Sequence, residues 1–99
     1  MTVEEYLKEV NPSIEILRKG LAAGCSALGI RQDTCLALTL LLDSRWALVL
    51  MLSFMVQEEE KGRRPDTTEI VLMAEKIKDA DIKRKTIEKK KRLQSKNPQ

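Results

Sequence analysis

An apolar stretch at residues 35–56 constrains this 99-residue chain more than any other feature. A membrane-spanning helix needs roughly 20 apolar residues, with charge kept away from its centre. Here Asp43-Ser44-Arg45 interrupts the stretch near its middle, and the longest uncharged run, residues 46–57, is too short to span a bilayer. We therefore expect two buried segments of a globular protein, and we do not expect a transmembrane helix.

Both segments favour helices, although the sequence also allows a strand pairing. The chain has only three aromatic residues, so its core must consist of aliphatic side chains, methionine and alanine, a mixture that favours helices. Alternate leucines on both sides of the central tripeptide also match the period of a β-hairpin. However, Val49 and Val56 are the only β-branched apolar residues there, and the turn lacks glycine and asparagine. We predict helices at residues 35–42 and 45–61, with the hairpin as the alternative.

Capping signals predict two helices before this stretch. A capping box at residues 2–5 begins a short amphipathic helix. Asn11 is a good N-cap, and Pro12 suits the first helical position, so a second helix is expected from Pro12 to about residue 28. Gly29 can end that helix in the left-handed conformation. Gly20-x-x-x-Gly24 lowers helix propensity, which indicates that a neighbouring helix approaches closely.

Polar residues precede each later helix. Asp33 or Thr34 is placed to cap the first apolar segment, and Asp43 or Ser44 the second. Gly62 can end the second segment, and a capping-box-like sequence at residues 66–69 begins the last helix. These signals agree on a helical chain throughout.

We therefore predict an all-α protein, a compact bundle of four to five helices around the central hydrophobic helix 45–61, with a basic C-terminal helical extension. The expected units are a helical domain at residues 1–82 and the basic extension at residues 83–99.

Charge is distributed unevenly along the chain. Residues 1–75 carry 8 Lys and Arg against 12 Asp and Glu, whereas residues 76–99 carry 10 against 3. The candidate contacts to nucleic acid or another anionic partner are Lys83, Arg84, Lys85, Lys89, Lys90, Lys91, Arg92 and Lys96. On a helix several of them would share one side and could follow phosphates. No aromatic residue lies among them, so base stacking is not expected. The alternative is a tail that is only solvated or that pairs with the acidic body.

The sequence offers no pattern for catalysis. It has no histidine, no glycine-rich phosphate loop and no nucleophile elbow. Cys25 and Cys35 form no CxxC pair, so we expect free thiols and no metal site. We predict no catalytic residue, no cofactor and no small-molecule substrate.

Residues 25–38 have about the spacing of a helix-turn-helix motif, with Gly29 in the turn. Its second helix would present Gln32, Asp33 and Thr34 followed by leucines, which are poor readers of DNA bases. We therefore expect an ordinary corner between two helices.

A short chain cannot easily enclose a helix that is apolar on all sides, so part of it is expected to face a partner. The candidate residues for this interface, with a protein partner or with a second copy of the chain, are Trp46, Met51, Met55 and Met73. The alternative is that these side chains belong to the core of one bundle.

The predicted function is that of a small, non-enzymatic interaction or regulatory protein that acts through protein–protein contacts, such as an accessory protein of a bacterium or a mobile element. The alternative is a nucleic-acid-binding accessory protein that uses the basic tail. A membrane-surface role is a third and weaker hypothesis, because the tail has few apolar anchors. The chain opens without a signal peptide and has free thiols, so a cytoplasmic location is expected.

Overall fold

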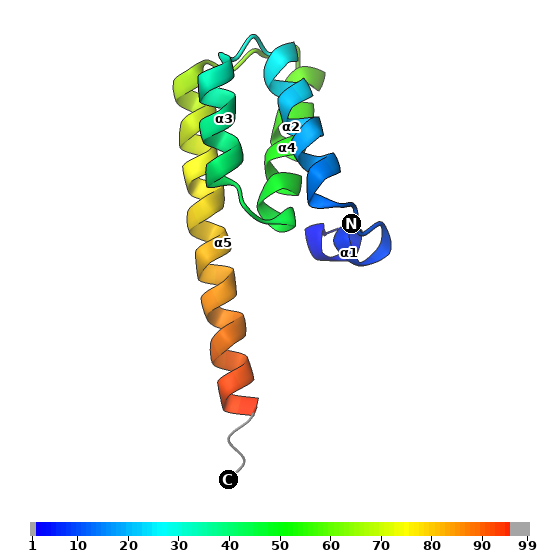
Figure 1. The fold of residues 1–99 in the computed structure, drawn as a ribbon, viewed down its shortest axis with the longest axis vertical. Helices are drawn as coiled ribbons and strands as arrows, with labels where there is room; N and C mark the ends of the chain where they lie inside the picture. Colours follow the sequence, from blue (N-terminus) through cyan, green and yellow to red (C-terminus); the bar gives the residue numbers. More distant parts are fainter. Residues whose placement is uncertain (1, 96–99) are drawn as a thin grey trace.

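The computed structural model describes residues 2–95, and these residues form five α-helices and no β-strand (Figure 1). The helices are α1 (Val3–Glu9), α2 (Ile14–Ala27), α3 (Gln32–Leu41), α4 (Arg45–Glu60) and α5 (Thr67–Ser95). The prediction of an all-α fold is confirmed. The apolar stretch forms two helices, α3 and α4, so the alternative of a hairpin is wrong.

Helices α2 to α5 form a bundle in which consecutive helices run in opposite directions (Figure 1). Both α2 and α5 contact α3 and α4, so the four helices surround one shared core. Helix α1 lies across one end of this bundle and packs against α4. None of the helices within residues 2–95 is long and apolar enough to cross a membrane.

The core between the helices is aliphatic. Its buried side chains come from every helix of the bundle and from the α3–α4 connection. The fully buried ones include Leu21, Leu42, Leu48, Met51 and Ile70. Removing one such side chain from water contributes about 1.5–3 kcal/mol.

The close approach predicted at the α2 glycines is present. A Cβ atom added to Gly24 would lie 2.8 Å from the Met55 sulfur on α4, which is inside van der Waals contact. A Cβ atom on Gly20 would meet Leu52 at 3.5 Å, which is an ordinary contact. A side chain at position 24 would therefore require the Met55 side chain to move.

Several helix ends follow the predicted capping chemistry. The Thr2 hydroxyl accepts a hydrogen bond from the Glu5 N–H at 3.1 Å, and Ser44 caps α4 in the same way. Gly29 and Gly62 both have φ of 71°, and each ends its helix in a Schellman motif.

Two predicted caps are wrong. Ser13, not Asn11, caps α2, because Asn11 adopts a left-handed conformation with φ of 46°. An N-cap residue needs an extended backbone, which Asn11 does not have. Asn11 and Pro12 therefore belong to the connection between α1 and α2, and the Ser13 hydroxyl accepts a hydrogen bond from the Ile16 N–H at 3.2 Å. The N-cap of α3 is Arg31, not Asp33 or Thr34. Asp33 lies in the first turn of this helix, where its carboxylate interacts favourably with the positive end of the helix dipole.

Candidate nucleic-acid interface

Helix α5 has two parts with different surroundings. From Ile70 to Asp81 it packs against the bundle. The four side chains buried there are those of Ile70, Ala74, Ile77 and Asp81. Between residues 82 and 93 no side chain is buried, and the helix continues beyond the other helices (Figure 1). The 29 residues of α5 give a rod of about 43 Å, because each residue rises about 1.5 Å. We call residues 83–95 the basic projection.

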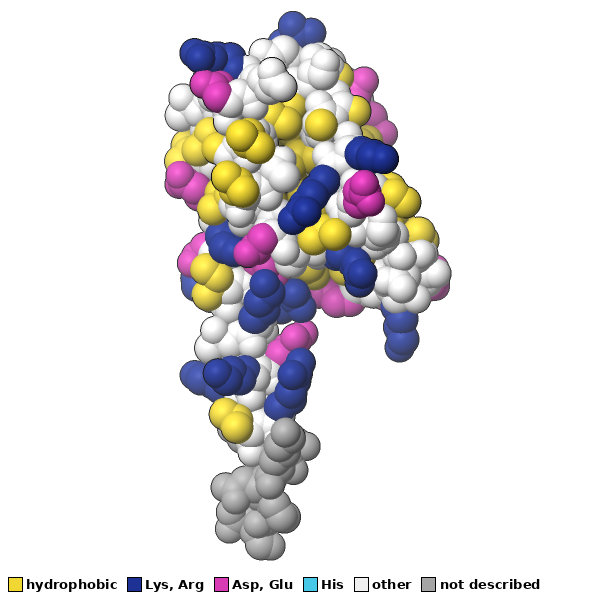
Figure 2. All heavy atoms as spheres, viewed as in Figure 1, with side chains coloured by type: hydrophobic (Ala, Val, Ile, Leu, Met, Phe, Trp, Pro, Cys, Tyr) yellow, Lys and Arg dark blue, Asp and Glu magenta, His cyan; other side chains and the backbone are white. Residues whose placement is uncertain are grey.

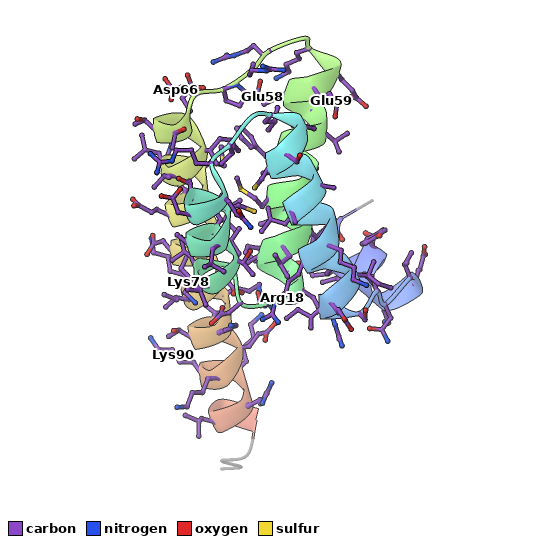
Figure 3. The ribbon with its side chains drawn as sticks, turned by 45° about the horizontal axis from the view of Figure 1, so that its top comes forward. Arg18, Glu58, Glu59, Asp66, Lys78 and Lys90 are labelled. Atoms are coloured by element: carbon purple, nitrogen blue, oxygen red, sulfur yellow. The ribbon has the colours of Figure 1, made fainter. Side chains whose placement is uncertain are left out.

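Seven of the eight predicted cations lie on the basic projection, and Lys96 lies outside the described residues. Within residues 2–95, four of the seven have no carboxylate within ion-pair distance, and these are Lys89, Lys90, Lys91 and Arg92. Figure 2 shows Lys and Arg side chains gathered on this part of the molecule. In Figure 3, Lys90 points away from the helix. Lys78, on the packed part, instead donates to Asp43 at 2.9 Å.

The other three cations form ion pairs at the base of the projection. Arg84 and Lys85 bind Asp81, at 3.0 and 3.2 Å. Lys83 lies 3.1 Å from Asp79, and both of these side chains are well exposed. An exposed pair of this kind contributes little and can be exchanged for another anion.

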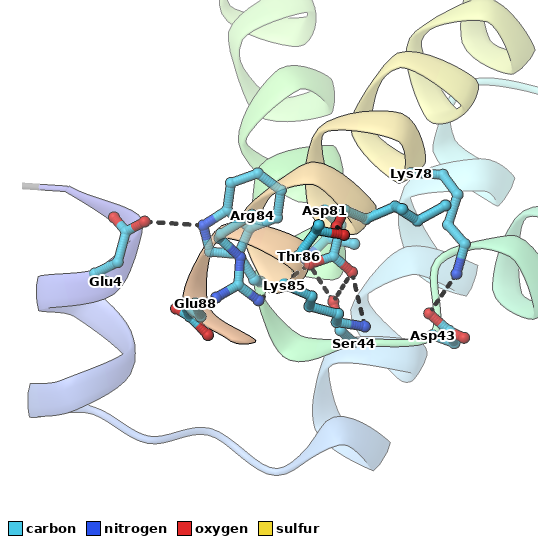
Figure 4. A network of polar contacts seen from close by, with 12 residues as sticks. Glu4, Asp43, Ser44, Lys78, Asp81, Arg84, Lys85, Thr86 and Glu88 are labelled. Atoms are coloured by element: carbon cyan, nitrogen blue, oxygen red, sulfur yellow. Dashed lines mark hydrogen bonds and ion pairs between the residues drawn. The ribbon is translucent and has the colours of Figure 1, made fainter. Parts of the chain in front are cut away.

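Asp81 is fully buried and joins the base of the projection to the start of α4 (Figure 4). The Ser44 hydroxyl donates to its Oδ2 at 2.7 Å, and the Arg84 guanidinium donates to its Oδ1 at 3.0 Å. Burial alone would raise the pKa of Asp81. The Ser44 hydroxyl, Arg84 and Lys85 outweigh that effect and lower the pKa below its ordinary value. The carboxylate therefore remains charged, and the orientation of Arg84 is held by it.

Trp46 lies against this same region, although it is 38 residues before Arg84 in the sequence. The guanidinium carbon of Arg84 lies 4.9 Å from the centre of the indole ring, in cation–π geometry. The indole N–H donates to Glu4 on α1 at 3.1 Å. Hydrogen bonding to the backbone, and then to this N–H, lowers the pKa of Glu4. The fold thus places an aromatic ring beside the basic helix, although no aromatic residue lies among the cations in the sequence.

Two open hollows share Trp46 and Arg84 in their linings. The first has a volume of about 460 Å³ and is lined by Trp46, Ala80, Lys83, Arg84, Ile87, Glu88 and Lys91. The second has a volume of about 470 Å³ and lies toward α1, where Glu4 and Asn11 contribute to it. The first hollow therefore combines an apolar wall with three cationic side chains.

The residues predicted for a partner interface have different environments. Met51 is fully buried and Met55 is 4% exposed, so both are core residues in this structure and line no accessible surface. Trp46 and Met73 are partly buried. The exposed apolar side chains lie elsewhere, and Leu36 and Leu40 on α3 are 62% and 74% exposed.

The two cysteines are free, and Cys25 is buried. Burial, with a smaller effect of the neighbouring Cys35, raises the pKa of the Cys25 thiol to about 12. That thiol is protonated at neutral pH and is a poor nucleophile. Within residues 2–95 no group of three or more potential metal-ligating side chains comes together.

Comparison of the chain with protein families, with curated proteins and with solved structures finds no match.

Proposed function

We propose that this chain is a non-enzymatic interaction protein whose basic projection binds the phosphate backbone of nucleic acid. The observation that supports this proposal is the group Lys89, Lys90, Lys91 and Arg92. These side chains are exposed, have no ion-pair partner within the described residues, and lie on a part of α5 that leaves the bundle.

The distribution of the cations around the basic projection favours a flexible polyanion as its partner. Successive residues of a helix are rotated by about 100°, so Lys89, Lys90 and Lys91 point to three different sides of the rod. An acidic protein surface would contact one side of such a rod. A nucleic-acid strand can follow charges around it, and each phosphate that is neutralised releases counterions and adds affinity.

The burial of the two methionines weakens the case for a protein partner at α4. The prediction of such an interface depended on an apolar surplus that the chain could not cover, and Met51 and Met55 are covered by the chain itself. In this proposal residues 1–82 serve as the domain that carries residues 83–99, with α4 as its centre. The protein would act in the cytoplasm.

The test compares two triple variants with the same change in charge. Lys89→Gln/Lys90→Gln/Lys91→Gln removes three cations from the projection. The matched control, Lys19→Gln/Lys61→Gln/Lys76→Gln, removes three exposed lysines from the bundle. Binding of a labelled oligonucleotide is measured by fluorescence anisotropy at about 50 and about 200 mM salt.

We expect the wild-type chain and the control to bind with an affinity that falls steeply with salt. The projection variant should bind more weakly, with a slope of log affinity against log salt that is smaller by about 2 to 3. Equal binding by the two variants would contradict the proposal, as would an affinity that does not respond to salt.

A second candidate function is self-association through α3. Residues 34–42 carry no charge, and Leu36 and Leu40 are one helical turn apart on its outer side. Exposed apolar patches of this kind are typical of protein contacts. Light scattering over a range of concentrations should show a rising mass for the wild type and a constant monomer mass for Leu36→Gln/Leu40→Gln. A wild-type chain that stays monomeric at every concentration would exclude this candidate.

A further inference from the structure

The 460 Å³ hollow at the base of the projection has the chemistry of a site for a flat, anionic ligand. Its apolar wall is formed by Trp46, Ala80 and Ile87. Lys91, which has no ion pair within the described residues, lies at the same hollow. The hollow is open, so a flat group can lie against its wall while the rest of the ligand stays in solvent.

Charge at this hollow is positive. Glu88 is its single acidic lining residue, and that carboxylate accepts a hydrogen bond from Arg84 at 3.1 Å. The pair of Lys83 with Asp79 is exposed, so a phosphate can replace the carboxylate at little cost. Lys83 and Lys91 are therefore available to an anion that approaches the hollow.

The arrangement of Arg84 over Trp46 points to a nucleobase as the flat part of the ligand. Unpaired bases are held in proteins by stacking on aromatic rings and on guanidinium planes. Here Asp81 and Glu88 both bind Arg84, so its position over the ring is already set before a ligand arrives. A preorganised group of this kind loses little conformational entropy on binding.

We propose that this hollow holds one unpaired base of a single-stranded nucleic acid, with the flanking phosphates on Lys83 and Lys91. This inference rests on the proposed function, because the basic projection must first bind the strand. A base within a duplex has both faces covered by its neighbours, so it cannot enter the hollow without leaving the stack. The chain should therefore prefer single strands.

The experiment uses the full chain, a single-stranded oligothymidylate and a duplex of the same length. Anisotropy of a labelled strand reports total binding. Trp46 is the only tryptophan of the chain, so its emission reports on the two hollows that share this ring. Ala80 lines only the first of them, so a variant at Ala80 separates the two. We expect the single strand to quench Trp46 emission and to bind more tightly than the duplex.

Ala80→Gln fills the hollow from an exposed position and should weaken binding of the single strand about tenfold, with the duplex affinity unchanged. Thr86→Gln is the matched control, because Thr86 is exposed on the same helix and does not line the hollow. Thermal unfolding checks that both variants retain the wild-type fold.

Two results would overturn the inference, and they can be told apart. Salt-sensitive binding that leaves Trp46 emission unchanged, with Ala80→Gln equal to the wild type, removes the base site and leaves phosphate binding intact. Absence of binding to either oligonucleotide at low salt removes the proposed function, and the base site with it.

Discussion

The two parts of α5 belong to one continuous helix but have opposite surroundings. In the packed part, Ile70, Ala74 and Ile77 are buried between α3 and α4, and Asp81 is buried at its end. In the basic projection, Ile87 and Leu93 are 54% and 60% exposed. Neither part contains glycine or proline, so helix propensity supports both of them. The two parts differ in their tertiary contacts.

This contrast predicts that the stability of the bundle and the binding of an anionic partner depend on different residues of α5. Substitutions in the packed part should change the free energy of unfolding, because they remove buried contacts. Substitutions in the basic projection should change affinity for an anionic partner and leave the unfolding of the bundle nearly unchanged. Failure of any of the following predictions would contradict this division of roles between the two parts of α5.

The largest expected difference is between two isoleucines of the same helix. Ile70→Ala should lower the free energy of unfolding by about 2–5 kcal/mol, because it leaves a cavity in the core. Ile87→Ala should change it by less than about 0.5 kcal/mol. Urea denaturation followed by circular dichroism measures both. A similar cost at both positions would mean that the basic projection is covered, for example by a second copy of the chain.

The next largest effect is expected at the boundary between the two parts. Asp81→Asn should destabilise the chain by about 2 kcal/mol at pH 7, because hydrogen bonds from charged donors to the buried carboxylate are lost. Asp79→Asn is the matched control, since Asp79 is exposed two residues earlier on the same helix. The control should have little effect in the same denaturation measurement.

The pH dependence of stability gives a second measurement on Asp81. Its pKa is lower in the folded chain than the ordinary value of 3.8, so its contribution is fully present above about pH 4. That contribution is lost as the pH falls through the folded-state pKa. Asp81→Asn should therefore lose less stability than the wild type on acidification. Identical acid unfolding of the two proteins would show that protonation of the Asp81 carboxylate does not change the free energy of unfolding.

The smallest effect on global stability is expected from a change in the helix backbone itself. Lys90→Gly should weaken the local helix by about 1 kcal/mol without moving the cooperative unfolding transition. Amide hydrogen exchange should show strong protection at Ile77 and weak protection near residue 90, because the basic projection can unfold locally. Equal protection in the two parts would indicate that the projection is packed against something.

The sequence was most informative where local chemistry decides the structure. The Asp43-Ser44-Arg45 tripeptide correctly divided the apolar stretch into two helices, since a serine cap and buried leucines act within one or two turns. Gly29 and Gly62 were predicted as helix ends for the same reason. Asn11 was misassigned because asparagine also tolerates the left-handed conformation, and Ser13 offers a second capping side chain two residues later.

The candidate site could be predicted only in part. The cations of the basic projection are visible in composition, and seven of them lie where a helical extension would place them. Asp81 was missed as a structural residue, although it continues the apolar stripe four residues after Ile77. An aspartate on a core stripe is the signal that could have found it, because such a group is buried only with partners.

By itself, the sequence determined that the chain is helical, where most helices begin and end, and that its last part is strongly basic. These properties depend on residues within a few positions of one another. The tertiary structure alone decided that Met51 and Met55 are covered and that Trp46 meets Arg84. Contacts between residues 38 positions apart depend on how whole helices cross, and those crossings result from the packing of all side chains together.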